Sequence, residues 1–330
     1  ADEGAEPAAA PELIAALLPF AVTRALPLLA RGRPVGALLL GVRRADRQRG
    51  ERARTVLSGI AQQVAMAIDN AQLIREALVA QRLENELALA RDIQQSFLPR
   101  EAPQLEGWTI AVDWQSARQV GGDFYDFIHM QEDGRLGIAI ADVADKGVPA
   151  ALFMAMTRSL LRGAAFSGRE PDAVLKRVNR LVLADTRSDL FVTVFYAILD
   201  AASGLMHYAN AGHNPPLRLS ATGELAPLAG NGMAIGVFEQ VEIPLCTVKL
   251  DPGDVLLMYT DGLIDAVSES GEEFGLARLG EVLVACGARP ASDIAAAAMD
   301  AIRAHTGGEQ PFDDQTLVVI RRDPAGSANR

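Results

Sequence analysis

The sequence is poor in cysteine and histidine, and each shortage excludes a class of site. Its 330 residues include only two cysteines, Cys246 and Cys286, which stand far apart and form no Cys-x-x-Cys pair. We therefore expect neither a disulfide framework nor a redox site, and this cysteine usage is typical of the reducing cytoplasm. Only four histidines are present, which makes zinc an unattractive metal for this chain.

The sequence also lacks an apolar run long enough to span a bilayer. The longest apolar stretch near its start, Leu13 to Ala30, is interrupted by two prolines and an arginine, and residues 148–166 contain Arg158 and Arg162. We expect neither a signal peptide nor a membrane span, and therefore a cytoplasmic protein with no membrane partner.

Positive charge is scarce in the C-terminal part of the chain. The formal net charge is −11, and residues 101–330 hold 18 basic and 31 acidic side chains. A surface this acidic repels phosphate backbones and attracts cations. We therefore expect no nucleic-acid partner.

Composition and periodicity divide the chain into five segments. Residues 1–12 are acidic, alanine-rich and proline-containing, which is typical of a disordered tail or linker. Two apolar runs, Leu26–Ala30 and Val35–Val42, flank Arg31-Gly32-Arg33-Pro34 and predict a β-hairpin. The stretch from Pro99 to Gly107 ends a long helix and marks a domain boundary. The predicted segments are 1–12, 13–56, 57–98, 99–322 and a disordered C-terminal tail at 323–330.

A heptad pattern runs through the predicted helix at 57–98. Small or apolar residues recur at alternating steps of three and four, and this seam predicts a parallel coiled-coil homodimer. A second seam follows out of phase with the first, which indicates a stutter and a rotatable junction near residues 79–83. The alternative is a single amphipathic helix that packs on its own domain. The first seam is Leu57, Ile60, Val64, Ala67, Ala71, Ile74 and Leu78, and the second is Leu83, Leu87, Ala90 and Phe97.

The segment beyond Gly107 is rich in strands, with helices grouped in blocks. This order predicts an α+β layered domain with largely antiparallel sheets. The predicted strands are 109–114, 123–129, 136–143, 191–199, 205–211, 255–259 and 316–320, and the predicted helices are 150–166, 172–185, 276–285 and 291–305.

Four short acidic motifs place an aspartate where an apolar strand starts or stops. They are Gly-Gly-Asp-Phe-Tyr-Asp at 121–126, Asp-Val at 142–143, Tyr-Thr-Asp-Gly at 259–262 and Asp-Asp-Gln-Thr at 313–316. Carboxylates gathered from distant strand ends repel one another unless a hard cation lies between them, so these motifs predict a magnesium or manganese site. Two such ions can lower the pKa of a water for in-line attack on phosphorus.

Six stretches resemble the SpoIIE-like and RsbU-like branch of the PPM serine/threonine protein phosphatases. The resemblance implies a four-layer α-β-β-α sandwich, a site for two Mn²⁺ or Mg²⁺ ions per chain, and hydrolysis of phosphoserine or phosphothreonine by an activated water without a phosphoenzyme. The stretches are Ala90-Arg-Asp-Ile-Gln-Gln-Ser-Phe-Leu-Pro99, Val120–Asp126, Asp142-Val-Ala-Asp-Lys-Gly-Val-Pro-Ala-Ala-Leu152, Asn210-Ala-Gly-His-Asn-Pro-Pro216, Tyr259–Leu263 and Asp313–Thr316.

The resemblance also implies which residues form the site. Asp123, Asp142, Asp261 and Asp313 are the implied catalytic metal ligands. The Val143 carbonyl adds an oxygen. Asp314 is a further implied ligand, and Asp126 and Asp145 are supporting candidates.

Two further residues are candidates for contact with the substrate. Arg118, five residues before Asp123, is predicted to hold a phosphate oxygen, and the alternative is a solvated loop arginine. His213 lies in the 210–216 motif, where it either contacts the substrate or orders the loop. The histidine of the eukaryotic branch is absent, because Ala144 stands in its place, so no general acid is implied.

The N-terminal part resembles the last portion of a GAF sensory domain. The matching stretches are Pro27–Ala37 and Ala61–Leu73, and they imply that 13–56 is a partial GAF-like α/β segment, followed by a coiled-coil linker at 57–98. Because the chain begins at Ala1 without a methionine, we expect it to be part of a longer sensor-phosphatase. The implied substrate is a phosphorylated anti-sigma-factor antagonist, a small STAS-type protein.

Two other functions are compatible with parts of the pattern. A catalytically degenerate phosphatase fold would act only as a partner-binding module. A diguanylate cyclase would explain Gly-Gly-Asp-Phe at 121–124, although it leaves Asp261 and the Asp313-Asp314 pair without a role.

Overall fold

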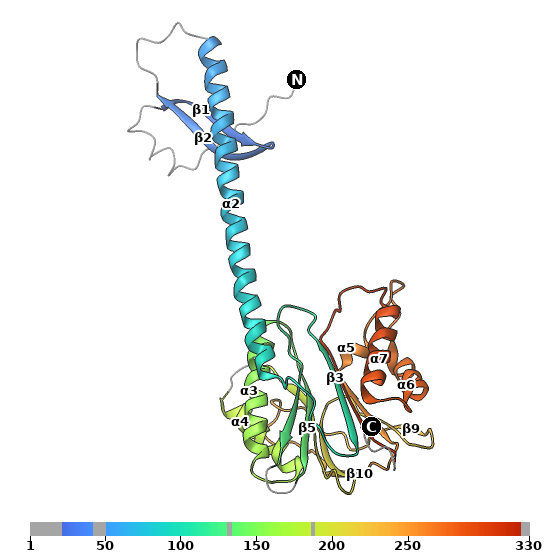
Figure 1. The fold of residues 1–330 in the computed structure, drawn as a ribbon. Helices are drawn as coiled ribbons and strands as arrows, with labels where there is room; N and C mark the ends of the chain where they lie inside the picture. Colours follow the sequence, from blue (N-terminus) through green and yellow to red (C-terminus); the bar gives the residue numbers. More distant parts are fainter. Residues whose placement is uncertain (1–21, 42–50, 131–133, 186–188, 325–330) are drawn as a thin grey trace. The chain divides into compact units, whose positions relative to one another are not determined.

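The computed structural model describes residues 22–41, 51–130, 134–185 and 189–324 (Figure 1). The tail predicted at 1–12 lies outside the described residues, as do 13–21 and 42–50 of the GAF-like segment and 325–330 of the C-terminal tail. The chain forms two compact units, Ala1–Glu86 and Leu87–Arg330. None of the described helices is long and apolar enough to cross a bilayer.

The first unit contains the predicted hairpin and most of a long helix. Strands β1 (Val22–Ala30) and β2 (Arg33–Gly41) pair antiparallel. Arg31 and Gly32 both have positive φ, 48° and 77°, as a two-residue turn that matches the strand twist requires. The hairpin prediction is therefore confirmed as far as Gly41, and Val42 lies outside the described residues.

Helix α2 (Glu51–Phe97) begins six residues before the start that the heptad pattern predicts. In the first unit, Ala61 and Ala65 are buried against Leu28 and Ala30 of the hairpin. The first heptad seam lies on a different set of residues, and most of its large members are exposed: Ile60 is 46% exposed, and Ile74 and Leu78 are each 61% exposed, whereas Leu57 is half-buried. The coiled coil itself stays a prediction.

The last turns of α2 belong to the second unit. Leu87 and Ala90 are half-buried, Gln94 is buried, and Leu98, one residue past the helix, joins a core cluster of the second unit. These positions follow one face of a helix. Of the second seam, Leu87 and Ala90 therefore pack on the helix's own domain, as the alternative predicts, whereas Leu83 and Phe97 are 57% and 37% exposed.

The second unit is built on two five-stranded sheets. Their orders are β10-β7-β6-β5-β4 and β3-β12-β11-β8-β9, and every strand pair within them is antiparallel. The strands of the first sheet are β4 (Phe124–His129), β5 (Leu136–Val143), β6 (Val192–Leu199), β7 (Leu205–Ala211) and β10 (Cys246–Lys249). Those of the second are β3 (Trp108–Gln115), β8 (Leu217–Leu219), β9 (Leu225–Pro227), β11 (Val255–Tyr259) and β12 (Gln315–Arg322).

Helices cover the outer face of each sheet. Helices α3 (Val148–Ala165) and α4 (Pro171–Asp185) share a core cluster with the first sheet, and α6 (Gly275–Cys286) and α7 (Ala291–His305) share another with the second. A third cluster fills the space between the sheets. Figure 1 shows α3 and α4 on one side and α6 and α7 on the other. This confirms the predicted four-layer α-β-β-α sandwich.

Four short elements are absent from the sequence-based prediction. They are β8, β9, β10 and α5 (Asp261–Ile264), of three or four residues each. Such elements are too short for a hydrophobic period to appear. The predicted strand at 123–129 also begins one residue later, so that Asp123 lies just before β4.

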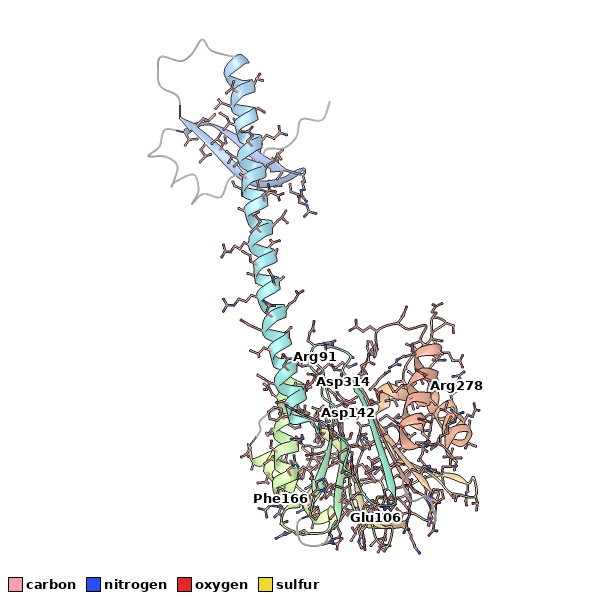
Figure 2. The ribbon with its side chains drawn as sticks, in the orientation of Figure 1. Arg91, Glu106, Asp142, Phe166, Arg278 and Asp314 are labelled. Atoms are coloured by element: carbon pink, nitrogen blue, oxygen red, sulfur yellow. The ribbon has the colours of Figure 1, made fainter. Side chains whose placement is uncertain are left out.

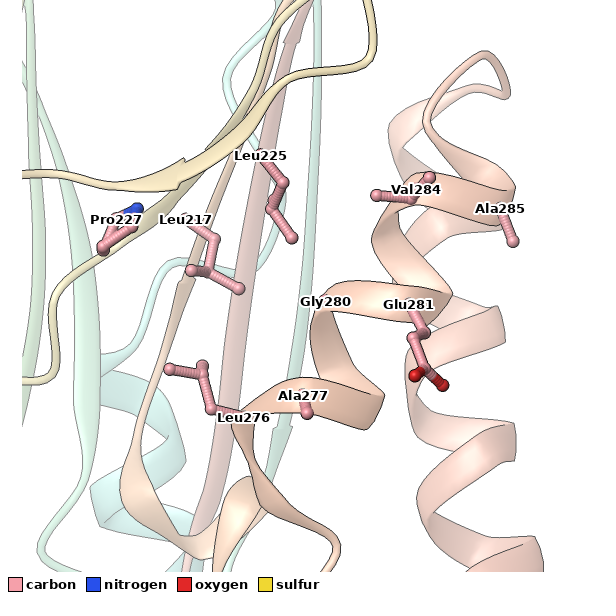
Figure 3. A pocket seen from close by; sticks show the side chains of 9 residues that line it. All are labelled: Leu217, Leu225, Pro227, Leu276, Ala277, Gly280, Glu281, Val284 and Ala285. Carbon is pink, nitrogen blue, oxygen red and sulfur yellow. The ribbon is translucent and has the colours of Figure 1, made fainter.

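An apolar cavity of about 650 Å³ lies between α6 and strands β8 and β9 (Figure 3). Leu217, Leu225 and Leu276 line it, and Glu281 is its single charged lining residue. None of the residues that line it belongs to the predicted metal site.

Candidate active site

The sheet topology brings the four acidic motifs to one end of the sandwich. Strands β4 and β5 pair antiparallel with Phe124 opposite Ala141, so Asp123 before β4 lies near Asp142 at the end of β5. Tyr259 of β11 pairs with Leu317 of β12, so the loops that carry Asp261 and Asp313 share the same edge of the second sheet. Asp142 and Asp314 lie at the same end of the sandwich, opposite Glu106 (Figure 2).

Asp123 joins the two sheets at this end. Its side chain is buried, and its Oδ2 accepts hydrogen bonds from the hydroxyls of Thr260 and Thr316, both at 2.7 Å. Both threonines come from the second sheet or its loops. Burial raises the pKa of Asp123 well above its ordinary value, and the nearby carboxylates of Asp142 and Asp314 raise it further.

The pKa values of Asp142 and Asp261 are raised as well. Burial, followed by the charge of Asp261, raises the pKa of Asp142 to about 7. Burial, followed by the charge of Asp313, raises the pKa of Asp261. The carboxylates are therefore close enough to repel one another, and each makes ionisation of its neighbours more costly.

Lys146 reaches Asp313 at the rim of the site. The distance from its Nζ to Asp313 Oδ2 is 2.7 Å, and the side chains of Lys146 and Asp313 are 26% and 38% exposed. The same ammonium donates to the Phe312 carbonyl at 3.0 Å and lies 4.0 Å from the Phe312 ring centroid. The Phe312 side chain itself is 82% exposed.

Asp314 holds the loop that precedes Asp123. Its Oδ1 accepts from the Ala117 N–H at 2.8 Å, and its Oδ2 accepts from the Gly122 N–H at 2.6 Å. Both oxygens are thus engaged by the backbone, and a metal would have to share one of them. The role of Asp314 as a metal ligand stays a prediction.

Close approach explains the pair of glycines at 121 and 122. A Cβ on Gly121 would lie 2.2 Å from Asp314 Oδ2, and one on Gly122 would lie 2.9 Å from the Val143 carbonyl oxygen. Both distances are shorter than a Cβ can tolerate. The glycines are needed because side chain and carbonyl oxygens crowd the turn, rather than because of a positive φ.

The two predicted substrate contacts lie in different surroundings. Arg118 is exposed on the loop that Asp314 holds, and its carbonyl accepts from the Ser116 hydroxyl. His213 is 1% exposed, its Nδ1 lies 2.9 Å from the Thr193 hydroxyl, and its backbone is bonded to the Asn210 side chain in both directions. Burial lowers the pKa of His213 to about 4. This placement favours the loop-ordering role of His213 over contact with a substrate.

Two supporting aspartates do not join the cluster. Asp126 faces α3, where its Oδ1 accepts from Arg158 at 3.1 Å and its Oδ2 lies 3.5 Å from Arg162. Asp145 is exposed in a turn with a φ of 84°, and its Oδ1 accepts from the Lys146 N–H. The alternation predicted for residues 123–129 sends Asp123 and Asp126 to opposite faces, and the position of Asp126 against α3 agrees with it.

Sequence reasoning missed the residues that hold the aspartates in place. Thr260 and Lys146 stand next to Asp261 and Asp145, and Thr316 stands two residues after Asp314, all inside the predicted motifs, but the motifs alone suggest no role for their hydroxyls and ammonium. A polar residue beside a predicted ligand is the signal that could have found them.

The donor set suits a hard divalent cation. Every converging side chain offers carboxylate oxygens, and three of these groups have raised pKa values that a cation would relieve. Within the described part of the chain, no three Asp, Glu, His or Cys side chains already adopt a metal-holding arrangement. Asp123 and Asp313 are instead engaged by the threonines and by Lys146.

Comparison with known proteins gives concordant results. The family Stage II sporulation protein E (SpoIIE) matches residues 132–323. Protein IcfG of Synechocystis sp. is 35% identical over 282 residues, which cover 75% of this chain and 44% of that protein. Phosphoserine phosphatase RsbU of Bacillus subtilis is 31% identical over 207 residues, which cover 62% of this chain and 61% of that protein. The chain thus spans about half the length of these curated relatives.

A solved structure reproduces the fold. The SiaA-PP2C domain of Pseudomonas aeruginosa superposes with a TM-score of 0.67 at 26% sequence identity, and the match covers 75% of this chain and 100% of that domain.

The raised pKa of Asp142 predicts how stability depends on pH without metal. The folded state holds a proton on Asp142 up to about pH 7, whereas the unfolded chain releases it near 3.8, so this group lowers stability as pH rises between these values. The slope reaches at most about 1.4 kcal/mol per pH unit. In EDTA, the melting temperature of Asp142→Asn minus that of the wild type should therefore increase from pH 5 to pH 7.5.

His213 contributes in the opposite direction, because its lowered pKa makes stability rise with pH up to about 6.5. Its contribution is the same in both proteins, so it drops out when their melting temperatures are subtracted. Asp300→Asn on the exposed face of α7 serves as the control and should follow the wild type at every pH. A difference in melting temperature that stays constant from pH 5 to pH 7.5 would contradict the raised pKa of Asp142.

Proposed function

The chain belongs to the SpoIIE family of protein phosphatases, and from this premise we propose that it removes phosphate from phosphoserine or phosphothreonine in a protein. The observation that carries the proposal is the cluster of Asp123, Asp142, Asp261 and Asp313 at the end of the sandwich. A relative named a phosphoserine phosphatase is 31% identical to this chain, and a PP2C domain shares its fold.

We propose Mn²⁺ or Mg²⁺ as the cofactor, with two ions per chain. The four aspartates would hold them together with the Val143 carbonyl, and Asp314 is a further candidate. When bound, such ions supply a water of low pKa as the nucleophile and neutralise charge on the phosphoryl oxygens. The raised pKa values of Asp142 and Asp261 support the need for a divalent cation.

The protein's own groups position the site and the substrate. Thr260 and Thr316 fix Asp123 by two hydrogen bonds, which hold its carboxylate rigid. Lys146 is a cation at an acidic rim and carries three donors, so it is suited to bind a phosphate oxygen once Asp313 turns to a metal. Arg118 is exposed on the loop beside the site and is the second candidate.

The protein substrate we propose is a phosphorylated STAS-type anti-sigma-factor antagonist. Resemblance to the RsbU-like branch supports this choice, and the acidic surface of the C-terminal part disfavours a nucleic-acid substrate. We propose the cytoplasm as its location.

Regulation through a dimeric linker is part of the same proposal. The first seam of α2 offers exposed Ile60, Ile74 and Leu78 for a second copy of the helix. A coiled coil formed there would transmit the state of a sensor to α3 and α4, which flank the strand that carries Asp142.

Of the two alternative functions, the diguanylate cyclase is excluded and the degenerate phosphatase fold is still open to test. The diguanylate cyclase interpretation is wrong, because Gly121-Gly-Asp-Phe124 stands in a two-sheet sandwich of the SpoIIE family. A degenerate, partner-binding phosphatase fold is distinguished by direct measurement of turnover.

Substitution of Asp261 by Asn should abolish metal-dependent phosphate release. A lost carboxylate ligand should lower turnover by about 100-fold or more, since even outer partners of metal ligands change activity by about 10- to 100-fold. Phosphate release from a phosphoserine STAS protein is measured with Mn²⁺, with Mg²⁺ and in EDTA. Asp300→Asn is the matched control and should keep wild-type turnover. Undiminished turnover in EDTA would refute the metal mechanism, and binding without turnover by the wild type would favour the degenerate fold.

Lys146→Met should raise the KM for the phosphoprotein by about 10- to 100-fold, because hydrogen bonds to charged groups contribute about 1.5–3 kcal/mol. Lys146→Arg should restore most of the loss, because it keeps the cation. Initial rates are measured over a range of substrate at saturating Mn²⁺, and the Mn²⁺ requirement is measured separately. If KM is unchanged and only the Mn²⁺ requirement is altered, Lys146 pairs with Asp313 and does not bind the substrate phosphate.

Charged residues in the first seam should dissociate the dimer and lower activity. The variant Ile74→Glu with Leu78→Glu places like charges in the predicted interface. Mass is measured by light scattering and activity by phosphate release. The control is Leu73→Glu with Val79→Glu, which changes two exposed apolar residues of the same helix outside the seam. Full activity in a monomer would break the link between dimerisation and catalysis.

A further inference from the structure

A buried glutamine near the end of α2 is bonded to the turn that carries Asp123. The Gln94 side chain is 4% exposed, its Nε2 donates to the Gly121 carbonyl at 2.6 Å, and its Oε1 accepts from the Gly121 N–H at 3.1 Å. The amide thus pairs with both backbone groups of one residue, as a neighbouring strand would. Gln94 belongs to the 90–99 motif, which none of the functions above explains.

Gly121 connects this amide to the carboxylates. Asp314 Oδ2 packs so closely on Gly121 that no Cβ fits there, and it also accepts from the Gly122 N–H. The Asp314 N–H in turn donates to Asp313 Oδ1 at 2.9 Å. One hydrogen-bonded path therefore runs from the end of α2 to the loops of both sheets.

Packing alone does not explain a glutamine at this position. The side chain lies on the buried face of the last turns, beside half-buried Leu87 and Ala90 and buried Leu98, where an apolar residue would be the default. Burying an amide costs free energy unless its donor and acceptor are both paired, so a glutamine here is favourable only with Gly121 in this place.

The helix end is held independently of Gln94. Leu98 packs in the core cluster of the first sheet, and the Tyr125 hydroxyl donates to the Pro99 carbonyl at 3.0 Å. Loss of the Gln94 amide should therefore release the turn at 121–122 without detaching the helix.

We propose that Gln94 is a positioning residue that fixes the Gly121–Gly122 turn and thereby sets Asp123 and Asp314 for metal binding. The inference deepens the proposed function and rests on it for the identity of the reaction. In this proposal the last turns of α2 are a structural part of the metal site. A small shift of this helix end then changes metal affinity without unfolding the domain.

The test compares Gln94→Met with Gln95→Met in the full chain. Methionine keeps the length of the side chain and removes both hydrogen bonds, and Gln95 is an exposed glutamine on the next position of the same helix. Mn²⁺ binding is measured directly by calorimetry, alongside phosphate release and melting temperature in EDTA. We expect Gln94→Met to weaken Mn²⁺ binding by about 10-fold and to lower kcat, as loss of an outer partner of metal ligands does. Gln95→Met should match the wild type.

Wild-type Mn²⁺ affinity and kcat in Gln94→Met would overturn the proposal. If that variant does not fold, the same measurements are made on Gln94→Glu, which keeps the volume and one acceptor but cannot donate to the Gly121 carbonyl when ionised. Loss of the fold in both variants would also overturn it, since Gln94 would then serve stability alone. If the wild type binds Mn²⁺ but releases no phosphate, the proposed function fails, while the calorimetry still decides the role of Gln94.

Discussion

The burial of like-charged carboxylates at the shared end of two sheets is the constraint on which the local structure depends. Burial and like charge both disfavour the ionised forms of Asp123, Asp142 and Asp261. Such groups stay together only where rigid partners hold them, here the hydroxyls of Thr316 in β12 and of Thr260 just after β11, and backbone N–H groups. The free energy that this arrangement costs is recovered when a divalent cation binds, so local stability is exchanged for cation affinity.

Much of the fold follows from periodicity, whereas the contacts within the site do not. The seven predicted strands and four predicted helices all occur, because each is long enough to show a period of two or 3.6. The positions of the aspartates at strand ends are also readable from the sequence. The pairing of Gln94 with Gly121 spans 27 residues, and the sequence shows only that the two residues stand in separate motifs, at 90–99 and 120–126. His213 looks like an active-site residue by its motif, but only the structure reveals its burial.

Helix α2 reconciles two interpretations of its sequence that first appear exclusive. Its first register leaves apolar side chains uncovered in the first unit, whereas in its last turns Leu87 and Ala90 are half-buried and Gln94 is buried within the second unit. A change of partner along one helix is a sufficient physical reason for a change of register. The contacts of α2 with the hairpin end near Ile68 and those within the second unit begin at Leu87, and the predicted phase break near residues 79–83 lies between them.

The hydrogen bond between Asp123 and Thr316 has a consequence for the order of events during folding. These residues are 193 positions apart, and β12, which carries Thr316, lies in the interior of its sheet between β3 and β11. Contacts of such high sequence separation form late, after the entropy of closing the loop has been lost. A nascent chain that stops before Gln315 therefore cannot assemble the acidic end of the sandwich, and during synthesis the candidate site takes shape only after the last strand has been made.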